Sequence, residues 1–404
     1  MKRRILLVGE AVTLAHVARP LVFAKQLKFQ YEIKIACDVS AHKWIIAEGW
    51  QPLIIHSLSS KEFLRRLKWG ECVFRESELR MNVEEDLSLL DEIKPDVVIG
   101  DFRLSLSISC RLAKIPYVNL GNAYWHGLDN VVRLPVPELP ITHVLGVGAS
   151  QWLFDRVAPF IMKRHGARFN KIRNYFGLSS LVEGLGNVYL DGDVAALVDL
   201  KECYPEVLEN DVVKFVGPGL WSPSITLPVW WSESGWSGRT VFICLGSSGQ
   251  INVTKIVVNA FLELKWTVLL STAGRFAPEN IQLNVDRLFI ADFLPAEEVI
   301  KRVDLLVCNG GSPMCQLAMA YGVSVIGVPS NLDQFLNMSM MKRHGIGYEI
   351  RPENLDIEGV INVVNVMHND NYKDKKNMFF AEKSKMSLES NHMLDLIKNT
   401  LGDY

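Results

Sequence analysis

The sequence predicts an α/β protein of two domains, and three observations lead to this fold class. The chain has 404 residues, about two to three times the usual length of one domain. Short apolar runs alternate with amphipathic stretches, which is typical of parallel strands that are buried on both faces and joined by helices. The runs form two groups, separated by a Gly- and Pro-rich stretch without periodicity at about 219–237. We therefore expect one domain over 1–219 and another over 220–379.

A strand is expected at each apolar run. In the first half the runs are RILLVG, YEIKIAC, DVVIGD and YVNLGN, and in the second they are TVFICLG, WTVLLST, RLFIADF, LLVCNGG and VSVIGVP. Two longer insertions, 56–92 and 125–186, interrupt the first half. From about 380 onward apolar residues recur at helical spacing, which predicts a terminal helix that packs back on the first domain. Open parallel sheets bind ligands at the carboxyl ends of their strands, so two such sheets facing each other would form a cleft.

Composition excludes several classes of protein. The net charge of −2 excludes nucleic acid as the main partner, because binding it needs clustered Lys and Arg. The seven cysteines are odd in number and lack metal-ligand spacing, so we expect reduced thiols. The basic start resembles a secretion signal, but its short apolar run at 5–8 is better explained as a buried strand. No run reaches the roughly 18 apolar residues of a membrane span. We expect a cytoplasmic protein.

An anion site is predicted where the run LLVC ends. Asn309, Gly310 and Gly311 follow this strand, and Ser312-Pro313 then opens a helix with Pro in its first turn, where Pro is preferred. A diphosphate can approach the bare backbone N–H groups at the positive end of the helix dipole, and no divalent metal is then required. The alternative is that the glycines serve only the geometry of a turn, and by themselves these two glycines favour that alternative.

The spacing of the residues that follow changes that balance. Counted from Asn309, further positions of one known signature fall in register without gaps: Gly311 at two residues on, Gly322 at thirteen, Pro329 at twenty, and Asp333-Gln334 at twenty-four and twenty-five. The segment 308–337 resembles the donor-binding signature of inverting, nucleotide-sugar-dependent glycosyltransferases of family 1, which have the GT-B fold of two Rossmann-like domains. The resemblance implies that Asp333 and Gln334 hydrogen-bond the sugar hydroxyls. The alternative is that this pair caps the next helix.

Two upstream elements also resemble this family. FLPAEEVI resembles its Trp-x-Pro-Gln segment, which implies that Phe293 stacks on the uracil base, although an aromatic residue here also suits a core. CLGSSGQ resembles its Gly-Ser element, which implies that Ser247 and Ser248 hydrogen-bond the phosphates. Together these elements imply a UDP-sugar donor.

Four positions depart from the family pattern. The histidine that contacts phosphate in the family is Asn309 here, and the further departures are Ala296 for Gln, Met314 for Thr or Ser, and Leu317 for the ribose-binding Glu of plant members. Asn309 can donate an amide hydrogen to a phosphate oxygen, but it cannot become cationic. Stabilisation of the leaving group would therefore rely more on the helix terminus.

A catalytic base is expected in the first half, because neutral imidazole can take the proton of an attacking hydroxyl near pH 7. His16 follows the first strand and loosely resembles the family's Gly-His-x-x-Pro element. Asp101 ends the strand DVVIGD, and the resemblance implies that it holds the other imidazole nitrogen. Helix caps are the alternatives for both residues. Asp96, at the entrance of the same strand, is a weaker rival to Asp101.

Two further features bear on metal and membrane. Asp191-Gly192-Asp193 matches the DxD metal-binding pattern of another class of glycosyltransferases, but acids around a Gly are frequent in turns and we interpret it as a turn. Residues 151–175 carry six Lys or Arg against one Asp, interleaved with apolar residues. This suits either contact with an anionic membrane surface or an ordinary surface helix. The insertion 56–92 would then be a wall for an apolar acceptor.

We therefore expect an inverting glycosyltransferase that moves a sugar from a nucleotide-sugar, taken as a UDP-sugar, to a hydroxyl of a small apolar or lipid-like acceptor. His16 and Asp101 are the expected catalytic residues, and the expected donor-binding residues are Ser247, Ser248, Phe293, Asn309, Gly310, Gly311, Ser312, Asp333 and Gln334. No metal and no cofactor are expected, since the nucleotide-sugar is a substrate. A nucleotide-sugar epimerase and a non-catalytic nucleotide-sugar-binding subunit are the alternatives.

Overall fold

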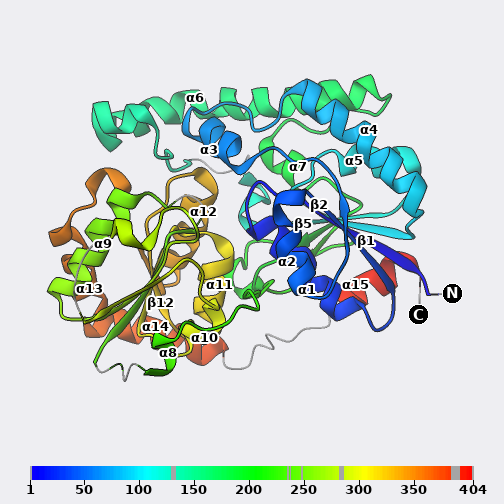
Figure 1. Cartoon of the computed structure of the whole chain (residues 1–404). Coiled ribbons are helices and arrows are strands. Elements are labelled where there is room, and N and C mark those ends of the chain that lie inside the picture. Colours follow the sequence, from blue (N-terminus) through cyan, green and yellow to red (C-terminus); the bar gives the residue numbers. More distant parts are fainter. Residues whose placement is uncertain are drawn as a thin grey trace. The chain divides into compact units, whose positions relative to one another are not determined.

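The chain folds around two parallel sheets, each in its own unit (Figure 1). The computed structural model describes residues 2–128, 133–233, 236, 238–246, 249–281, 286–383 and 392–402. The first unit comprises Met1–Leu134, Trp152–Trp221 and Leu388–Tyr404, and the second comprises Pro135–Gln151 and Ser222–Ser387. The predicted fold class, two α/β domains with parallel sheets, is confirmed.

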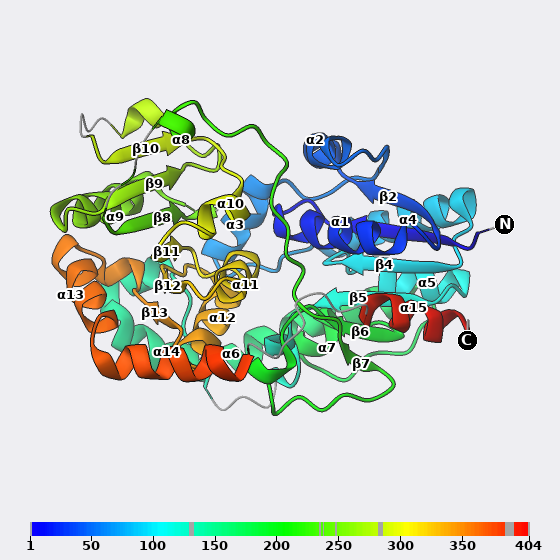
Figure 2. The ribbon, with the colours of Figure 1, turned by 90° about the horizontal axis from the view of Figure 1, so that it is seen from below.

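The sheet of the first unit has seven parallel strands in the order β3-β2-β1-β4-β5-β6-β7 (Figure 2). They are β1 Arg4–Gly9, β2 Glu32–Cys37, β3 Pro52–Ile54, β4 Val97–Asp101, β5 Tyr117–Gly121, β6 Val194–Leu197 and β7 Val213–Phe215. Ile5 and Leu7 pack into one core cluster and Leu6 into another, which explains the continuous apolar run of β1. Gly9 pairs with Asp101, so the carboxyl ends of β1 and β4 lie side by side.

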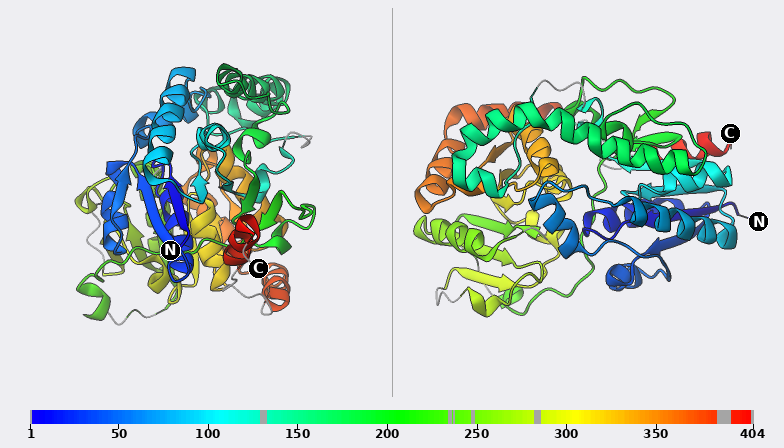
Figure 3. Two further views of the ribbon diagram at one scale, coloured as in Figure 1. Left: turned by 90° about the vertical axis from the view of Figure 1, so that its right-hand side faces the viewer. Right: turned by 90° about the horizontal axis from the view of Figure 1, so that it is seen from above.

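Helices pack on this sheet. They are α1 Ala15–Leu27, α2 His42–Ala47, α3 Ser60–Lys68, α4 Glu76–Ile93, α5 Leu106–Ala113, α7 Leu185–Tyr189, α15 His392–Leu401 and the part of α6 (Pro140–Tyr175) from Trp152 on, with 3₁₀ turns η1 Val39–Ala41, η2 Ala123–Trp125 and η4 Lys201–Cys203. The terminal helix α15 contacts α1 and buries Met393, Leu396 and Ile397 in the same core. Figure 3 shows this helix in red, near the N-terminus. It begins at His392, later than the expected 380, where α14 still runs.

The second unit repeats this plan. Its six parallel strands have the order β10-β9-β8-β11-β12-β13 (Figure 2). The strands are β8 Thr240–Cys244, β9 Thr267–Ser271, β10 Leu288–Ala291, β11 Leu305–Cys308, β12 Ser324–Gly327 and β13 Gly347–Glu349. The helices are α8 Trp230–Glu233, α9 Ile251–Glu263, α10 Ala296–Ile300, α11 Ser312–Ala320, α12 Leu332–Arg343, α13 Ile357–Met367 and α14 Asp370–Lys383, with η6 Pro278–Asn280 and η7 Pro352–Asn354. The strands β3, β6, β7 and β13 were not among the predicted runs; each has only three or four residues.

One segment of the first half of the sequence belongs to the second unit. The predicted first domain, 1–219, includes 135–151, but hydrogen bonds attach this segment elsewhere. The backbone N–H of Glu138 donates to the Ser330 oxygen at 2.9 Å, and Arg351 Nη2 donates to the Val136 oxygen at 3.0 Å. Gly146, with φ 75° and ψ 162°, then interrupts α6. A contiguous domain assignment fails here because these contacts are remote in sequence.

The basic stretch 151–175 is the first-unit part of α6. Arg173 is buried and pairs with Asp191 at 2.8 Å, so it does not contribute to a basic surface. Trp152 and Phe160 are 59% and 69% exposed, and the Arg156 guanidinium lies 3.6 Å from the Trp152 ring centroid. Among the residues described above, none of the helices has the length and apolar character needed to cross a membrane.

Candidate active site

The predicted base and its partner meet at the carboxyl edge of the first sheet. β4 ends at Asp101, and α1 begins at Ala15, which puts His16 in its first turn. His16 Nδ1 lies 2.7 Å from Asp101 Oδ1. A Cβ on Gly9 would lie 2.6 Å from the backbone oxygen of His16, so glycine at the end of β1 lets α1 approach the strand. We call His16 and Asp101 the dyad.

Neither member of the dyad is the N-cap of the helix that it was expected to cap. The N-cap residues of α1 and α5 are Leu14 and Ser105. The Asp101 side chain is 1% exposed and the His16 side chain 18%, so a buried carboxylate holds a partly open imidazole. Asp96, the rival of Asp101, accepts a hydrogen bond from the backbone N–H of Arg4 at 2.7 Å and so fixes the start of β1.

Arg19, which the sequence did not single out, is the third charged residue beside the dyad. Its Nη2 donates to Asp101 Oδ1 at 2.9 Å, and its Nε lies 2.7 Å from Asp101 Oδ2. Its Nη1 donates to Asn122 Oδ1 at 2.7 Å, just past β5. The sequence offered one signal for Arg19, which stands three residues after His16 on the same helix. This spacing predicts that the two side chains lie on one face of the helix, but it does not predict which residue Arg19 contacts.

These contacts assign the tautomer of His16. The Asp101 carboxylate, paired with Arg19, accepts hydrogen bonds, so we place the imidazole proton on Nδ1, facing Asp101. Arg19 Nη2 also lies 3.0 Å from Nδ1, but a protonated Nδ1 has no lone pair to accept from it. Nε2 then carries the free lone pair, which is the form that a general base requires.

Aromatic side chains cover one face of the imidazole. Phe102 stacks on His16 with 4.6 Å between ring centroids and 11° between the planes. Its φ of 58° lies in the left-handed region, which is costly for a residue other than glycine. Phe63, Phe74 and Tyr189 surround Phe102 at centroid distances of 5.3 to 6.0 Å. The insertion 56–92 thus supplies two rings of this apolar wall.

A cluster of ion pairs around Arg103 lies in the same unit. Arg103 pairs with Glu10 at 3.1 Å, Asp86 at 3.0 Å and Glu85 at 2.7 Å, and Glu85 Oε1 lies 2.6 Å from Nδ1 of His56. Burial raises the pKa of both Glu10 and Asp86, against the lowering effect of Arg103. At the outer end, the hydrogen bond to Glu85 raises the pKa of His56, whose side chain is 86% exposed. The cluster is closed at one end and open to solvent at the other.

In the second unit, the residues of the predicted anion site lie between β11 and the start of α11. Gly310 has φ 77°, and a Cβ there would lie 2.6 Å from Met338 Cγ, so only glycine fits. Gly311 is the N-cap of α11, and the first helical residue, Ser312, is 4% exposed. The three residues therefore bring main-chain N–H groups to the start of a nine-residue helix.

Asn309 turns its amide nitrogen toward the loop after β8. Its Oδ1 accepts a hydrogen bond from the Gly311 N–H at 3.1 Å, and a Cβ on Gly246 would lie 3.1 Å from its Nδ2. Ser247 and Ser248, the next residues of that loop, lie outside the described residues. The donor end of Asn309 therefore points to the loop that was expected to contact phosphate.

Asp333 and Gln334 differ in their surroundings. The N-cap of α12 is Asn331, whose side chain accepts from the Gln334 N–H at 3.1 Å, so neither member of the pair is the cap. Gln334 is 6% exposed, and its Oε1 accepts from the N–H of Ser330 at 2.9 Å and from its Oγ at 3.2 Å. Asp333 is half-buried. Gln334 thus supports the loop, and Asp333 is the more open of the two.

Phe293 follows β10 and is half-buried. Gly274, after β9, has φ 68°, and a Cβ there would lie 3.3 Å from the Phe293 ring. Pro295 is the N-cap of α10. The aromatic ring therefore packs against a neighbouring loop at the carboxyl edge of the sheet.

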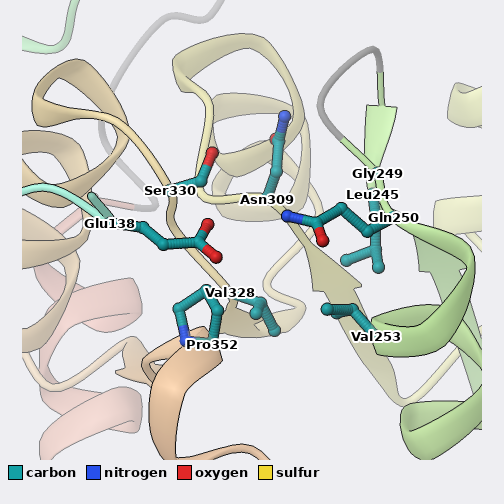
Figure 4. Close-up of a pocket in the computed structure, with 9 residues that line it drawn as sticks. All are labelled: Glu138, Leu245, Gly249, Gln250, Val253, Asn309, Val328, Ser330 and Pro352. Carbon is teal, nitrogen blue, oxygen red and sulfur yellow. The ribbon is translucent and has the colours of Figure 1, made fainter. Parts of the chain in front are cut away.

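A pocket of about 250 Å³, including its open mouth, lies at the carboxyl ends of β8, β11 and β12 (Figure 4). It is lined by Glu138, Leu245, Gly249, Gln250, Val253, Asn309, Val328, Ser330 and Pro352. Figure 4 shows the Glu138 carboxylate pointing into it. Pockets that hold a whole ligand have about 300–1,000 Å³, so this one suits part of a nucleotide-sugar.

The two acids of the DxD motif have structural partners. Asp191 pairs with Arg111 at 2.7 Å and Arg173 at 2.8 Å, and Asp193 accepts from the Tyr117 N–H at 2.9 Å. Within the described ranges no group of three or more His, Cys, Asp or Glu residues is arranged to hold a metal. The seven cysteines are free thiols.

Comparisons with known proteins show that the chain is a glycosyltransferase. Residues 240–393, which include the second sheet, match the family model described as Glycosyltransferase family 28 C-terminal domain. The solved structure "Spinosyn Rhamnosyltransferase SpnG" has TM-score 0.70 at 16% identity and covers 98% of this chain and 100% of its own, so the two share the GT-B fold.

Two relatives cover most of the chain. A "PGL/p-HBAD biosynthesis glycosyltransferase" of Mycobacterium tuberculosis (strain ATCC 25177 / H37Ra) is 41% identical over 360 residues, 89% of this chain and 83% of the relative. A "PGL/p-HBAD biosynthesis rhamnosyltransferase" of Mycobacterium bovis (strain BCG / Pasteur 1173P2) is 39% identical over 364 residues, 90% of this chain and 80% of the relative. The chain belongs to the same glycosyltransferase family as these two relatives.

Proposed function

We propose that this glycosyltransferase moves a hexose from a nucleotide-sugar, with UDP as the expected nucleotide, to the hydroxyl of an apolar or lipid-like acceptor with inversion at the anomeric carbon. The observation that carries the proposal is the dyad. A buried Asp101 holds Nδ1 of His16 at 2.7 Å and leaves Nε2 for the acceptor. An epimerase would need acid and base groups around the sugar and no acceptor.

His16 acts as the general base. As the acceptor oxygen attacks the anomeric carbon, its proton passes to His16 Nε2, the new C–O bond forms and the bond to the nucleoside diphosphate breaks. Asp101 stabilises the imidazolium that results, since their Nδ1 and Oδ1 atoms lie 2.7 Å apart. One displacement of this kind inverts the anomeric configuration. It requires the acceptor oxygen at His16 to reach the anomeric carbon of a donor bound to the second unit.

The departing diphosphate is stabilised by the start of α11. Because Gly310 and Gly311 have no side chains, phosphate oxygens can approach the first turn of α11, where the helix dipole favours negative charge. Asn309 adds one amide donor in place of the family's histidine. No metal takes part in this proposal, because the helix terminus supplies the stabilisation that a cation would give.

Further donor contacts follow from the resemblance. Phe293 stacks on the base, Ser247 and Ser248 bind phosphate, and Asp333 accepts from sugar hydroxyls. Gln334 has its carbonyl oxygen bound by Ser330, so its sugar contact is through the amide nitrogen. The relative named a rhamnosyltransferase makes a deoxyhexose the first sugar to test.

The acceptor side is apolar. The rings of Phe102, Phe63, Phe74 and Tyr189 lie next to the base, which suits an acceptor that is largely hydrocarbon or aromatic.

The enzyme works in the cytoplasm, at the inner face of the membrane, through α6. Trp152 and Phe160 are exposed beside Arg156, a combination that suits the interface of an anionic bilayer. Co-sedimentation with anionic vesicles is expected to exceed that with zwitterionic vesicles and to fall in Trp152→Ala/Phe160→Ala. Equal binding of both proteins to both vesicles contradicts this contact.

A donor panel tests the function. Thermal-shift assays with UDP, TDP and GDP are followed by mass spectrometry of products from candidate hydroxyl acceptors, and NMR of the product gives its anomeric configuration. We expect transfer with inversion. Altered sugar without acceptor would indicate an epimerase, and binding without donor consumption would indicate a non-catalytic subunit.

Gly310→Ala tests the anion site separately. A Cβ there meets Met338 Cγ at 2.6 Å and displaces the loop, so nucleotide affinity should fall. Gly322→Ala is the matched control: Gly322 has φ 68° but nothing within 4 Å of an added Cβ. Equal nucleotide affinity in the two variants would argue against diphosphate binding at Gly310.

A further inference from the structure

Arg19 has no part in the mechanism above, although its Nη2 lies 3.0 Å from His16 Nδ1. Resting on the proposed function, we propose that Arg19 is a positioning residue of the reaction with two effects. It holds the Asp101 carboxylate in the orientation that receives the His16 proton, and it offsets the charge of that carboxylate so that the imidazole stays neutral.

Arg19 contacts both oxygens of the carboxylate, Oδ1 through a hydrogen bond and Oδ2 as an ion pair. Nη2 donates to Asp101 Oδ1 at 2.9 Å, and Nε lies 2.7 Å from Oδ2. A guanidinium is a rigid planar fork, so this pairing sets the plane of the carboxylate as well as its position. The two side chains are 6% and 1% exposed, so water does not compete for these contacts. His16 therefore meets a carboxylate with a single orientation.

The guanidinium is itself anchored. Nη1 donates to Asn122 Oδ1 at 2.7 Å, and Asn122 Nδ2 donates to both oxygens of Asp199 at 3.1 and 3.2 Å. The backbone N–H of Ala123 donates to Asp199 Oδ2 at 2.7 Å. Hydrogen bonds thus link Arg19 to residues just past β5 and β6 as well as to the end of β4. The dyad is attached to three neighbouring strands of the sheet rather than to one.

A glycine of the Gly- and Pro-rich boundary makes room for this arginine. A Cβ on Gly219 would lie 3.0 Å from Arg19 Cγ and 3.1 Å from Val198 Cγ1. From the sequence, Gly217-Pro218-Gly219 marked only a domain boundary. In the structure, the absent side chain at Gly219 accommodates the stem of Arg19.

The charge of Arg19 opposes protonation of the base. A carboxylate at hydrogen-bond distance favours the imidazolium, which has no lone pair left to accept the acceptor proton. Among the residues that the structure describes, the charged groups within hydrogen-bond distance of His16 are Asp101 from β4 and Arg19 from its own helix, and Phe102 covers one ring face. Because Arg19 neutralises the same carboxylate, Asp101 can orient His16 without holding it protonated. The imidazole is then available as a base.

Two substitutions separate charge from orientation. In Arg19→Gln the cation is lost, and the acid limb of the kcat/KM profile should move to higher pH by about one unit, with about a tenfold loss at pH 6 beyond any loss at pH 9. Arg19→Lys keeps the charge but not the fork, so the acid limb should stay in place while kcat falls at all pH values. Gly219→Ala, which displaces Arg19 without removing it, should behave as Arg19→Lys does.

Lys25→Gln is the matched control, because it removes one cation from the same helix at a site paired with Glu48. Its profile should equal that of the wild type. An acid limb that is unmoved in Arg19→Gln, or moved to lower pH, overturns the charge-offsetting effect. Circular dichroism confirms folding, and if Arg19→Gln does not fold, Arg19→Lys and Gly219→Ala carry the test. A displaced acid limb in either overturns the proposal.

A spectroscopic measurement separates this proposal from the proposed function. ¹⁵N NMR of the histidines in the unliganded protein reports which nitrogen of His16 is protonated. We expect the Nδ1–H form in the wild type and a mixture of tautomers in Arg19→Gln. An unchanged tautomer in Arg19→Gln overturns the orienting effect. This readout needs no donor or acceptor, so it stands even if His16→Ala retains turnover and the proposed function fails.

Discussion

The described residues of the first unit include two histidine–carboxylate pairs of nearly equal length that differ in burial and in their aromatic neighbours. His16 Nδ1 lies 2.7 Å from Asp101, and His56 Nδ1 lies 2.6 Å from Glu85. Each carboxylate also pairs with an arginine, Arg19 for Asp101 and Arg103 for Glu85. A search for such pairs by distance alone would return both.

Burial separates the two pairs. The His16 and Asp101 side chains are 18% and 1% exposed, whereas those of His56 and Glu85 are 86% and 25% exposed. Within the described part of the chain, His16 has an aromatic ring stacked on its face and His56 has none. Water competes with the exposed pair and screens its charges, so it contributes little. Burial and the stacked ring thus distinguish His16, the proposed base, from the surface ion pair of His56.

The largest expected effect follows from removing each imidazole in turn. His16→Ala should lower kcat by about 10²–10⁴-fold, the usual contribution of a general base, with donor binding nearly unchanged. His56→Ala should leave kcat near the wild-type value. Steady-state kinetics with saturating donor measures both. Full turnover in His16→Ala would remove the distinction between the two pairs.

Arg103→Met should cause the largest loss of stability. Arg103 is fully buried between Glu10 and Asp86, and removing it leaves two buried carboxylates without a cation. Breaking such a pair costs about 3–5 kcal/mol. The control Arg65→Met removes an exposed arginine paired with Glu62 and should cost far less, because water screens this pair. Denaturant unfolding gives both values, and equal losses would mean that the buried cluster is not closed to water.

Replacing each carboxylate by the corresponding amide tests the comparison of the two pairs further. Asp101→Asn keeps the shape but no longer fixes the proton on Nδ1 of His16, so kcat should fall by about 10²-fold or more. Glu85→Gln, the same change at the exposed pair, should leave kcat unaffected. A small effect of Asp101→Asn would indicate that Arg19 and Phe102 orient the imidazole without the carboxylate.

The smallest expected effect is a pH dependence of stability at His56. Its hydrogen bond to Glu85 raises its pKa above the ordinary 6.5. The ion pair therefore contributes fully below pH 6.5 and is lost as the pH rises through the raised pKa of the folded protein. Melting temperatures of the wild type and His56→Ala should differ slightly near pH 5.5 and converge at alkaline pH. A difference that grows with pH contradicts this direction.

Much of the fold could be predicted because its strands are buried on both faces. All nine predicted apolar runs form strands of the two sheets. The missed strands β3, β6, β7 and β13 have three or four residues, too few for a run to stand out from its surroundings. The need for glycine at 310 could also be predicted, because a turn from a strand directly into a helix limits which residues fit there.

The sequence by itself determined which residue types stand at or after the carboxyl ends of the strands. His16 follows β1, Asp101 ends β4, and two glycines follow β11. Parallel strands bring their carboxyl ends to one edge, so these positions follow from order along the chain. Only the tertiary structure decided that Arg19 holds Asp101, that Gln334 turns toward Ser330 and that 135–151 joins the second unit. Each of these depends on a side-chain direction or on a hydrogen bond between remote residues. Spacing along a chain does not encode such directions, because the packing around each side chain selects its rotamer.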